Sequence, residues 1–221
     1  MYKRFGKRAL DLVCSGLAIV CLSPVLAVIA LWVKASSPGP VLFTQKRVGR
    51  GKTFFRIYKF RTMRIDTPHD MPTHLLENPD AFITSAGRFL RRTSLDELPQ
   101  IFNIFLGQMS VVGPRPALWN QDDLVAERDK YGANDCVPGL TGYAQVHGRD
   151  ELPIPVKAEL DGYYAKNLSF GLDVKIFFRT IGSVLHHEGV VEGKQPDQGQ
   201  DPGIKQAPPI EQTMLNGRRF L

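Results

Sequence analysis

Cysteine is scarce in this sequence. Among 221 residues there are only Cys14, Cys21 and Cys136, and no two of them are spaced as CxxC. A disulfide framework or a structural zinc site requires more cysteines at closer, regular spacing. We therefore expect neither, and we expect a protein of a reducing compartment.

Acidic residues are nearly absent from the first third of the chain. Residues 1–64 contain 13 lysines and arginines but a single acid, Asp11, which gives this part a net charge of +12, whereas residues 65–221 sum to −6. Such a basic region can face anionic lipid headgroups, phosphorylated substrates or nucleic acid. Because its cations flank an apolar segment, we expect a membrane partner and no nucleic acid.

No charged residue occurs in the 22 residues 12–33. This length suffices for a helix to cross a hydrocarbon core of about 30 Å. It is too long for a signal peptide, and no small-residue cleavage site follows it.

Two details of this segment favour a re-entrant helix over a crossing helix. Lysines and arginines flank both ends, which satisfies the positive-inside preference only if both ends stay in the cytoplasm. Near the middle, Ser23 and Pro24 predict a break, because proline removes a backbone hydrogen bond. We expect a helix–break–helix wedge in one leaflet; a kinked single-pass anchor is the alternative.

A β-hairpin is predicted next. Residues 41–48 and 53–60 are rich in β-branched and aromatic residues, and the Gly-containing segment 49–52 joins them. The joining segment lacks the spacing of a P-loop. Lys59 and Arg61, at the end of the second strand, are the cations of this region that we expect to contact a phosphate.

The most informative stretch contains two adjacent carboxylates, Asp96 and Glu97. Ser94 and Glu97 have the spacing of a capping box, which predicts a helix beginning here, with Gly107 as its stop. In the simplest interpretation both acids only complement the helix dipole. The basic segment 86–92 precedes them, with Arg88 as its substrate-binding candidate, and carboxylates beside guanidiniums suit binding of an Mg²⁺–diphosphate.

Two later loops supply further candidates. The prolines on either side of Arg115 hold its guanidinium rigidly, which suits bidentate phosphate recognition, although an ordinary proline turn is the alternative. The glycine-rich segment 138–149 is typical of a ligand-facing loop. Within it we single out Gln145 and Arg149 as substrate-binding candidates.

These elements predict an α+β fold: a re-entrant membrane helix, then a small, mostly helical cytosolic domain with a β-hairpin. We divide the chain into a membrane-associated segment 1–36, a catalytic domain 37–193 and a flexible, polar tail 194–221. Helices are expected within 119–131, 159–164 and 169–187, the last one amphipathic and lying on the core or on the bilayer surface. Residues 68–79, with His69 and His74, are expected to form a surface loop.

Taken in order, these features resemble the bacterial sugar transferases, the small monotopic polyprenyl-phosphate phosphoglycosyl transferases. The resemblance covers about residues 3–191, and its marks are Ser23-Pro24 and the segments 59–63, 94–100, 110–116 and 138–146. It implies transfer of a sugar 1-phosphate from a UDP-sugar to undecaprenyl phosphate, at the cytoplasmic face of the bacterial inner membrane. A membrane-attached scaffold that binds anionic lipid without catalysis is the alternative, and a homodimer is left open.

The resemblance also implies roles for individual residues. Asp96 would be the nucleophile that forms a phosphosugar–aspartyl intermediate, Glu97 would hold Mg²⁺ and Arg115 would grip phosphate. Asp161 matches a recurring acidic position and is expected to support substrate binding. The chain departs from the family pattern at three positions that bear on substrate preference: Val137, Tyr143 and His147.

Overall fold

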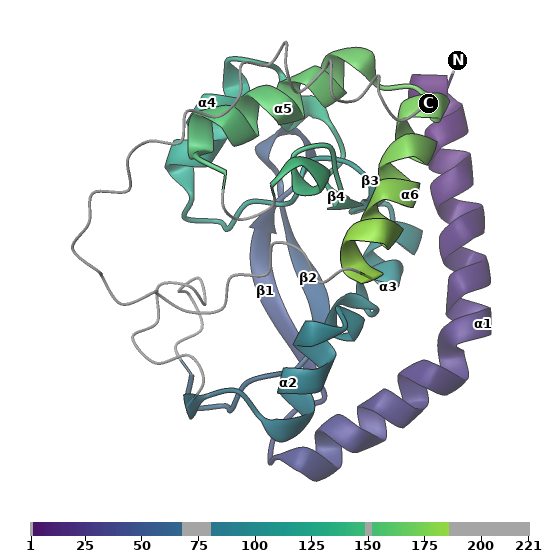
Figure 1. Ribbon diagram of the computed structural model, residues 1–221, viewed down its shortest axis with the longest axis vertical. Helices are drawn as coiled ribbons and strands as arrows, with labels where there is room; N and C mark the ends of the chain where they lie inside the picture. The colour runs from purple at the N-terminus through teal and green to yellow at the C-terminus, as the bar shows by residue number, and fades with distance from the viewer. Residues whose placement is uncertain (1, 68–80, 149–151, 186–221) are drawn as a thin grey trace.

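One long helix lies along the side of a small mixed domain in the computed structural model, which describes residues 2–67, 81–148 and 152–185 (Figure 1). After a short turn, Tyr2–Gly6, the helix α1 runs continuously over Lys7–Ser36. Within the described residues, α1 is the one helix long and apolar enough to cross a membrane. Little of its apolar stretch is buried, so it is not the core helix of the domain.

The predicted break in α1 is a bend rather than an interruption. Pro24 lies inside the helix, and Figure 1 shows α1 changing direction at about its middle. Proline bends a helix because its ring displaces the preceding turn and it donates no hydrogen bond. The Ser23 hydroxyl donates to the Val20 carbonyl at 2.8 Å, as serine does where a helix bends. The expected helix–break–helix is therefore one continuous helix with a bend at Pro24.

The predicted hairpin is confirmed. Strands β1, Leu42–Val48, and β2, Phe54–Phe60, pair antiparallel with Leu42 opposite Phe60 and Val48 opposite Phe54. A second pair was not predicted: β3, Ser110–Val112, lies parallel to β4, Gly139–Thr141. Parallel strands need a crossover, and the helix α4, Asp122–Asp129, lies within it.

The remaining helices agree in type with the predictions. They are α2, Ser85–Arg92, α3, Gln100–Phe105, α5, Ile154–Asn167, and α6, Phe170–Leu185. Gly107 has φ +82° and ends α3 as expected. Residues 68–80, 149–151 and 186–221 lie outside the described residues, so the predicted loop with His69 and His74 and the tail 194–221 stay predictions.

The capping box was wrong. Ser94 makes no capping hydrogen bond and has a left-handed backbone with φ 57°. The helical stretch is divided into a single 3₁₀ turn, η5, Leu95–Glu97, and the helix α3. The cap in this region belongs to α2, where the Thr84 hydroxyl accepts from the Gly87 amide at 3.0 Å.

Apolar packing joins the far half of α1 to the domain. Ile29 and Val33 of α1 form one buried cluster with Phe60 of β2 and Leu90 of α2. Leu95 and Leu98, on either side of the two acids, pack against the same cluster. The acidic turn is therefore held between α1 and the hairpin.

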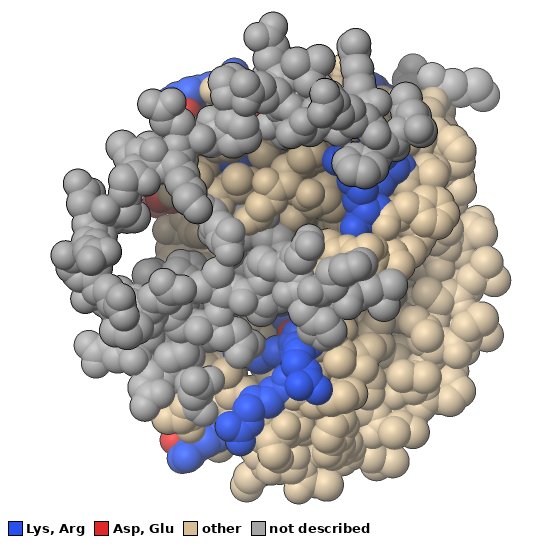
Figure 2. Space-filling model, in the orientation of Figure 1, with Lys and Arg blue, Asp and Glu red and all other residues tan. Residues whose placement is uncertain are grey.

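Large apolar side chains elsewhere remain exposed on α1, α3 and α6. They include Phe102, Phe105 and Leu106 at α3 and Phe170, Phe177 and Phe178 of α6. Within α3 the apolar side chains are divided: Ile101 and Ile104 are buried in the domain, whereas Phe102 and Phe105 are exposed. Figure 2 shows the side of the molecule formed by α1 as a broad uncharged surface.

Candidate active site

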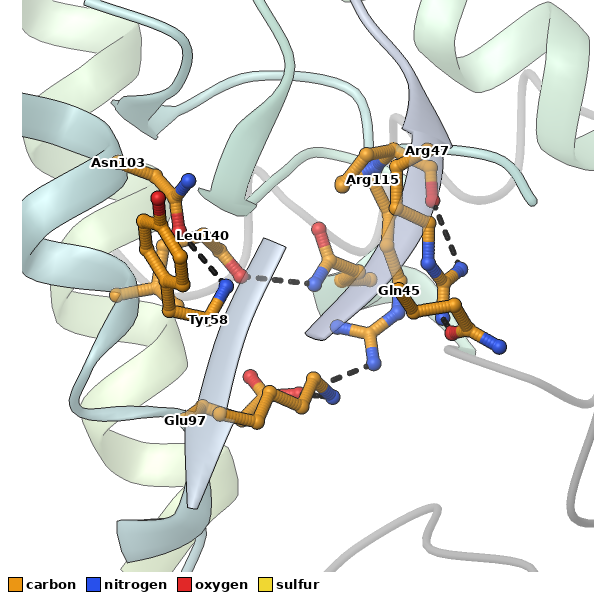
Figure 3. A network of polar contacts seen from close by, with 10 residues as sticks. Gln45, Arg47, Tyr58, Glu97, Asn103, Arg115 and Leu140 are labelled. Carbon is orange, nitrogen blue, oxygen red and sulfur yellow. Dashed lines mark hydrogen bonds and ion pairs between the residues drawn. The ribbon is translucent and has the colours of Figure 1, made fainter. Parts of the chain in front are cut away.

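Hydrogen bonds from the first turns of α3 fix the acidic turn against the hairpin. Asn103 is fully buried; its Oδ1 accepts from the Tyr58 amide at 3.0 Å, and its Nδ2 donates to the Arg56 carbonyl at 2.8 Å. Both partners lie on β2, so α3 is tied to the strand that carries Lys59 (Figure 3). Asp96 and Glu97 precede α3 by a few residues, so these hydrogen bonds also hold the two acids beside β2.

Glu97 is held by two cations from distant parts of the chain. Its Oε1 accepts from Lys59 Nζ of β2 at 2.7 Å and from Arg115 Nη2 at 3.2 Å. Figure 3 shows the Arg115 guanidinium directed toward Glu97. Burial alone would raise the pKa of Glu97, but the Lys59 and Arg115 charges outweigh it and hold this pKa well below its usual range. Glu97 is therefore ionised at every physiological pH.

The neighbouring acid behaves in the opposite way. The pKa of Asp96 is raised to about 6, chiefly by burial and also by the Glu97 charge, against the opposing effect of Lys59, Arg91 and Arg115. Adjacent carboxylates whose pKa values are pushed apart by their surroundings are typical of sites with divided roles. At neutral pH most of Asp96 is ionised, but its charge is poorly stabilised, which suits a reactive carboxylate.

The turn before the acids is strained. Ser94 has φ 57°, a left-handed conformation that is costly for a residue with a Cβ atom. Its amide donates to the Arg91 carbonyl at 3.1 Å and its carbonyl accepts from the Glu97 amide at 3.3 Å. The strained residue thus joins α2 directly to the acidic turn, and strain of this kind is concentrated at functional sites.

Arg115 is positioned by the β3–β4 pair. The Gly113 amide donates to the Thr141 carbonyl at 2.8 Å, and the Gly139 amide donates to the Pro114 carbonyl at 2.9 Å. The two backbones approach so closely that a Cβ atom on Gly139 would collide with the amide of Gly113. Glycine is required here by this close approach, and the loop carrying Arg115 is consequently rigid.

The structure brings together four of the residues singled out in the sequence: Lys59, Asp96, Glu97 and Arg115. It also adds Arg91 of α2, whose charge acts on Asp96, whereas Arg88 of the same helix is exposed. From the sequence we single out Arg88 of this basic helix for the substrate, and that role stays a prediction.

Two predicted substrate residues have partners within the protein. Arg61 is 5% exposed and donates through Nη2 to the Ser37 carbonyl at 2.7 Å, beneath the turn that follows α1. Asp161 is 1% exposed, and its Oδ2 accepts from Nε and Nη2 of Arg128 at 2.9 and 2.6 Å. The Asp161 carboxylate is paired with Arg128 inside the protein, which favours a structural role. Nε and Nη1 of Arg61 are buried without a hydrogen-bond partner among the described residues. The substrate roles of both residues stay predictions.

The last two candidates differ from each other. Gln145 donates through Nε2 to the Leu140 carbonyl at 3.2 Å, and its Oε1 is buried with no partner in the described part of the chain. Arg149 lies outside the described residues and stays a prediction. Gln145 is therefore held against β4, and its Oε1 remains a buried acceptor without a donor among the described residues.

The acids are a small donor set for a metal ion. The described residues contain no group of three or more His, Cys, Asp or Glu side chains arranged for a metal. Mg²⁺ commonly binds through one or two protein carboxylates and completes its shell with water and substrate phosphate oxygens. Asp96 and Glu97 fit that mode of binding, and they do not fit an all-protein site.

Comparison with known proteins identifies relatives over most of the chain. The profile of the family described as bacterial sugar transferase matches residues 2–187. The UDP-N-acetylgalactosamine-undecaprenyl-phosphate N-acetylgalactosaminephosphotransferase of Aeromonas hydrophila is 41% identical over 189 residues, which cover 82% of this chain and 44% of that protein. The UDP-glucose:undecaprenyl-phosphate glucose-1-phosphate transferase of Escherichia coli K12 is 40% identical over 191 residues, or 80% of this chain and 40% of that protein.

A shorter relative matches over nearly its whole length. The exopolysaccharide production protein PSS of Rhizobium leguminosarum bv. phaseoli is 41% identical over 191 residues, which cover 81% of this chain and 94% of that protein. The matched part of this chain thus spans about two fifths of the length of the longer relatives and nearly the whole length of the shorter one.

Proposed function

This chain belongs to the bacterial sugar transferase family, and we propose that it transfers a sugar 1-phosphate from a UDP-sugar to undecaprenyl phosphate with release of UMP. The observation that carries the proposal is the pair of acids in unequal states, Asp96 with a raised pKa and Glu97 ionised between Lys59 and Arg115. The names of the relatives from Aeromonas and Escherichia support the same reaction class. The product would begin the assembly of a polysaccharide or another glycoconjugate.

The reaction takes place in two displacements at one phosphorus atom. In the first, an Asp96 carboxylate oxygen attacks the phosphorus that bears the sugar; the bond from this phosphorus to the bridging oxygen breaks, and UMP leaves with the electron pair. In the second, an oxygen of undecaprenyl phosphate attacks the same phosphorus and the aspartyl–phosphorus bond breaks. The carboxylate of Asp96 is thereby restored, and the lipid carries a diphosphate linked to the sugar.

The remaining charges of the site bind and orient the diphosphate. Lys59 and Arg115, which hold Glu97 in the free protein, present ammonium and guanidinium donors where a diphosphate would lie beside Asp96. We propose that Glu97, with Asp96, would hold Mg²⁺. The ion would supply neutralisation of the diphosphate charge and stabilisation of the leaving UMP.

We also propose that α1 is re-entrant, with both ends at the cytoplasmic face of the inner membrane. The bend at Pro24 and the cations at both ends of the helix support this topology. The exposed apolar side chains of α3 and α6 would extend the lipid-facing surface of α1. A wedge in one leaflet would allow a soluble nucleotide sugar and a lipid phosphate to meet at the acids.

Release of UMP tests the reaction. Purified protein is incubated with Mg²⁺, undecaprenyl phosphate and each of a panel of UDP-sugars, which also identifies the sugar. We expect the unmodified protein to release UMP and Asp96→Asn to release none. Equal release by both proteins would show that Asp96 is not the nucleophile, and no release with any sugar would favour a scaffold that only binds anionic lipid.

Cysteine labelling tests the topology. In a background with Cys14, Cys21 and Cys136 replaced by serine, one cysteine is placed within the first five residues and another shortly after residue 60. We expect both to be protected from a membrane-impermeant reagent added outside intact cells. Labelling of the first position alone would establish a spanning helix.

A further inference from the structure

The first turns of α1 make directional polar contacts with both halves of the site. Arg8 donates through Nη1 to the Ile104 carbonyl and through Nη2 to the Phe105 carbonyl, each at 2.7 Å. These carbonyls end α3, where a helix leaves its last acceptors unsatisfied and where a cation is favourable. Arg8 therefore fixes the end of the helix whose beginning follows the two acids.

One turn further along α1, a carboxylate holds the other half. Asp11 is 6% exposed, and its Oδ1 accepts from the Val111 amide of β3 at 3.0 Å. β3 ends at Val112, three residues before Arg115. Asp11 is the single acid of residues 1–64, and its carboxylate accepts this hydrogen bond.

The two contacts come from one face of the helix. Residues three apart lie on the same side of an α-helix, so Arg8 and Asp11 face the domain together. Ser15, one turn beyond, is 2% exposed and donates to the Asp11 carbonyl at 2.6 Å. The far half of α1 instead meets the domain through apolar packing of Ile29 and Val33. The near half of α1 thus contacts the domain through directional hydrogen bonds, which fix the positions of α3 and β3, whereas the far half contacts it through apolar packing.

We infer that Arg8 and Asp11 are positioning residues that set the acidic turn and the Arg115 loop relative to each other, so that α1 aligns the active site as well as attaching it. Arg115 must reach Glu97, to which it lies at 3.2 Å, and the two groups are carried by elements that Arg8 and Asp11 grip separately. A rigid helix that holds both elements fixes the distance between them. This inference rests on the proposed phosphosugar transfer, because it is the reaction that requires the alignment.

The burst of UMP in the absence of lipid acceptor separates alignment from stability. Without undecaprenyl phosphate each competent site releases one UMP, so the burst amplitude counts folded sites and the burst rate reports how well they are aligned. We expect Arg8→Gln and Asp11→Leu each to slow the burst about tenfold at unchanged amplitude, as small misplacements of reacting groups do. Asp11→Asn, whose amide oxygen can still accept from Val111, should retain most of the rate.

The chain offers a matched control for Arg8. Lys3 donates to the Ala165 and Lys166 carbonyls at 3.4 and 2.9 Å, at the end of α5, which lies outside the described set of hydrogen-bond partners of Glu97, Lys59 and Arg115. Lys3→Gln should leave the burst rate within about twofold, since it removes the same kind of contact from a helix outside the site.

Three results would overturn the inference. They are unchanged burst rates in Arg8→Gln and Asp11→Leu, a loss of amplitude without a loss of rate, and equal slowing by Lys3→Gln. A failure of the proposed reaction itself is distinguishable, because the unmodified protein would then release no UMP at all.

Discussion

Replacing the nucleophile should stabilise this protein at neutral pH. Asp96 has its pKa raised from 3.8 to about 6, so the folded state binds its proton more tightly than the unfolded state does. As pH rises above about 4, the unfolded chain releases this proton first, and the free energy of unfolding therefore falls. The cost grows up to about pH 6 and is constant above that, whereas an asparagine at this position never incurs it.

The magnitude follows from the shift. A difference of roughly two pKa units, at about 1.4 kcal/mol each, amounts to about 3 kcal/mol of folding free energy at pH 7.5. For a domain of this size we expect Asp96→Asn to raise Tm by about 6–12 °C at pH 7.5. At pH 4 the two proteins should unfold at nearly the same temperature, because Asp96 is protonated in the folded state there.

The assay is thermal unfolding of detergent-solubilised protein in EDTA, with Glu97→Gln as the companion variant. Glu97 has a lowered pKa, so its charge contributes stability that is present above about pH 4.5 and is lost as pH falls below that value. Glu97→Gln should therefore lower Tm at pH 7.5, since Lys59 and Arg115 lose their partner. A lower Tm for Asp96→Asn at pH 7.5, or an equal gain at pH 4 and pH 7.5, would refute the reasoning.

Three further predictions concern single residues. Gly139→Ala should lower both Tm and UMP release, because its new Cβ would force apart the β3–β4 pair; Gly171→Ala, at a site with nothing within 4 Å, should lower neither. Asp161→Leu should cost about 3–5 kcal/mol in denaturant unfolding by leaving Arg128 buried without its partner, and the KM for the UDP-sugar should not change if Asp161 is structural. Adding Mg²⁺ should raise the Tm of the unmodified protein more than that of Asp96→Asn, and equal shifts would remove Asp96 from the metal site.

Local patterns were sufficient for the elements that are local in origin. The hairpin follows from two runs of β-branched and aromatic residues joined by a glycine-containing turn, and all seven of its paired positions come from adjacent segments. The end of α3 at Gly107 follows from the freedom of glycine to take a positive φ. The pairing of β3 with β4 was missed because each strand is three residues long and the partners are separated by a crossover.

Long-range contacts decided which charged residues belong to the site. Arg61 follows Lys59 by two residues, so both point to the same side of an extended chain, and the sequence offered no way to separate them. In the structure Arg61 is drawn to Ser37 at the end of α1, while Lys59 reaches Glu97. Arg8 was likewise grouped with the cations expected at the lipid surface, although it caps α3.

The two acids show the same limit most clearly. A capping box would pair Glu97 with Ser94, three residues away, and would leave Asp96 and Glu97 equivalent as first-turn acids. The structure instead gives Glu97 partners 38 and 18 residues away, Lys59 and Arg115, while Ser94 adopts a left-handed turn without capping anything. Because these partners stabilise one charge and burial destabilises the other, the pKa values separate in a direction that adjacency alone could not predict. The division between a reactive carboxylate and a permanently charged one is therefore a property of the packed hairpin, α3 and the Arg115 loop, and not of the acidic pair itself.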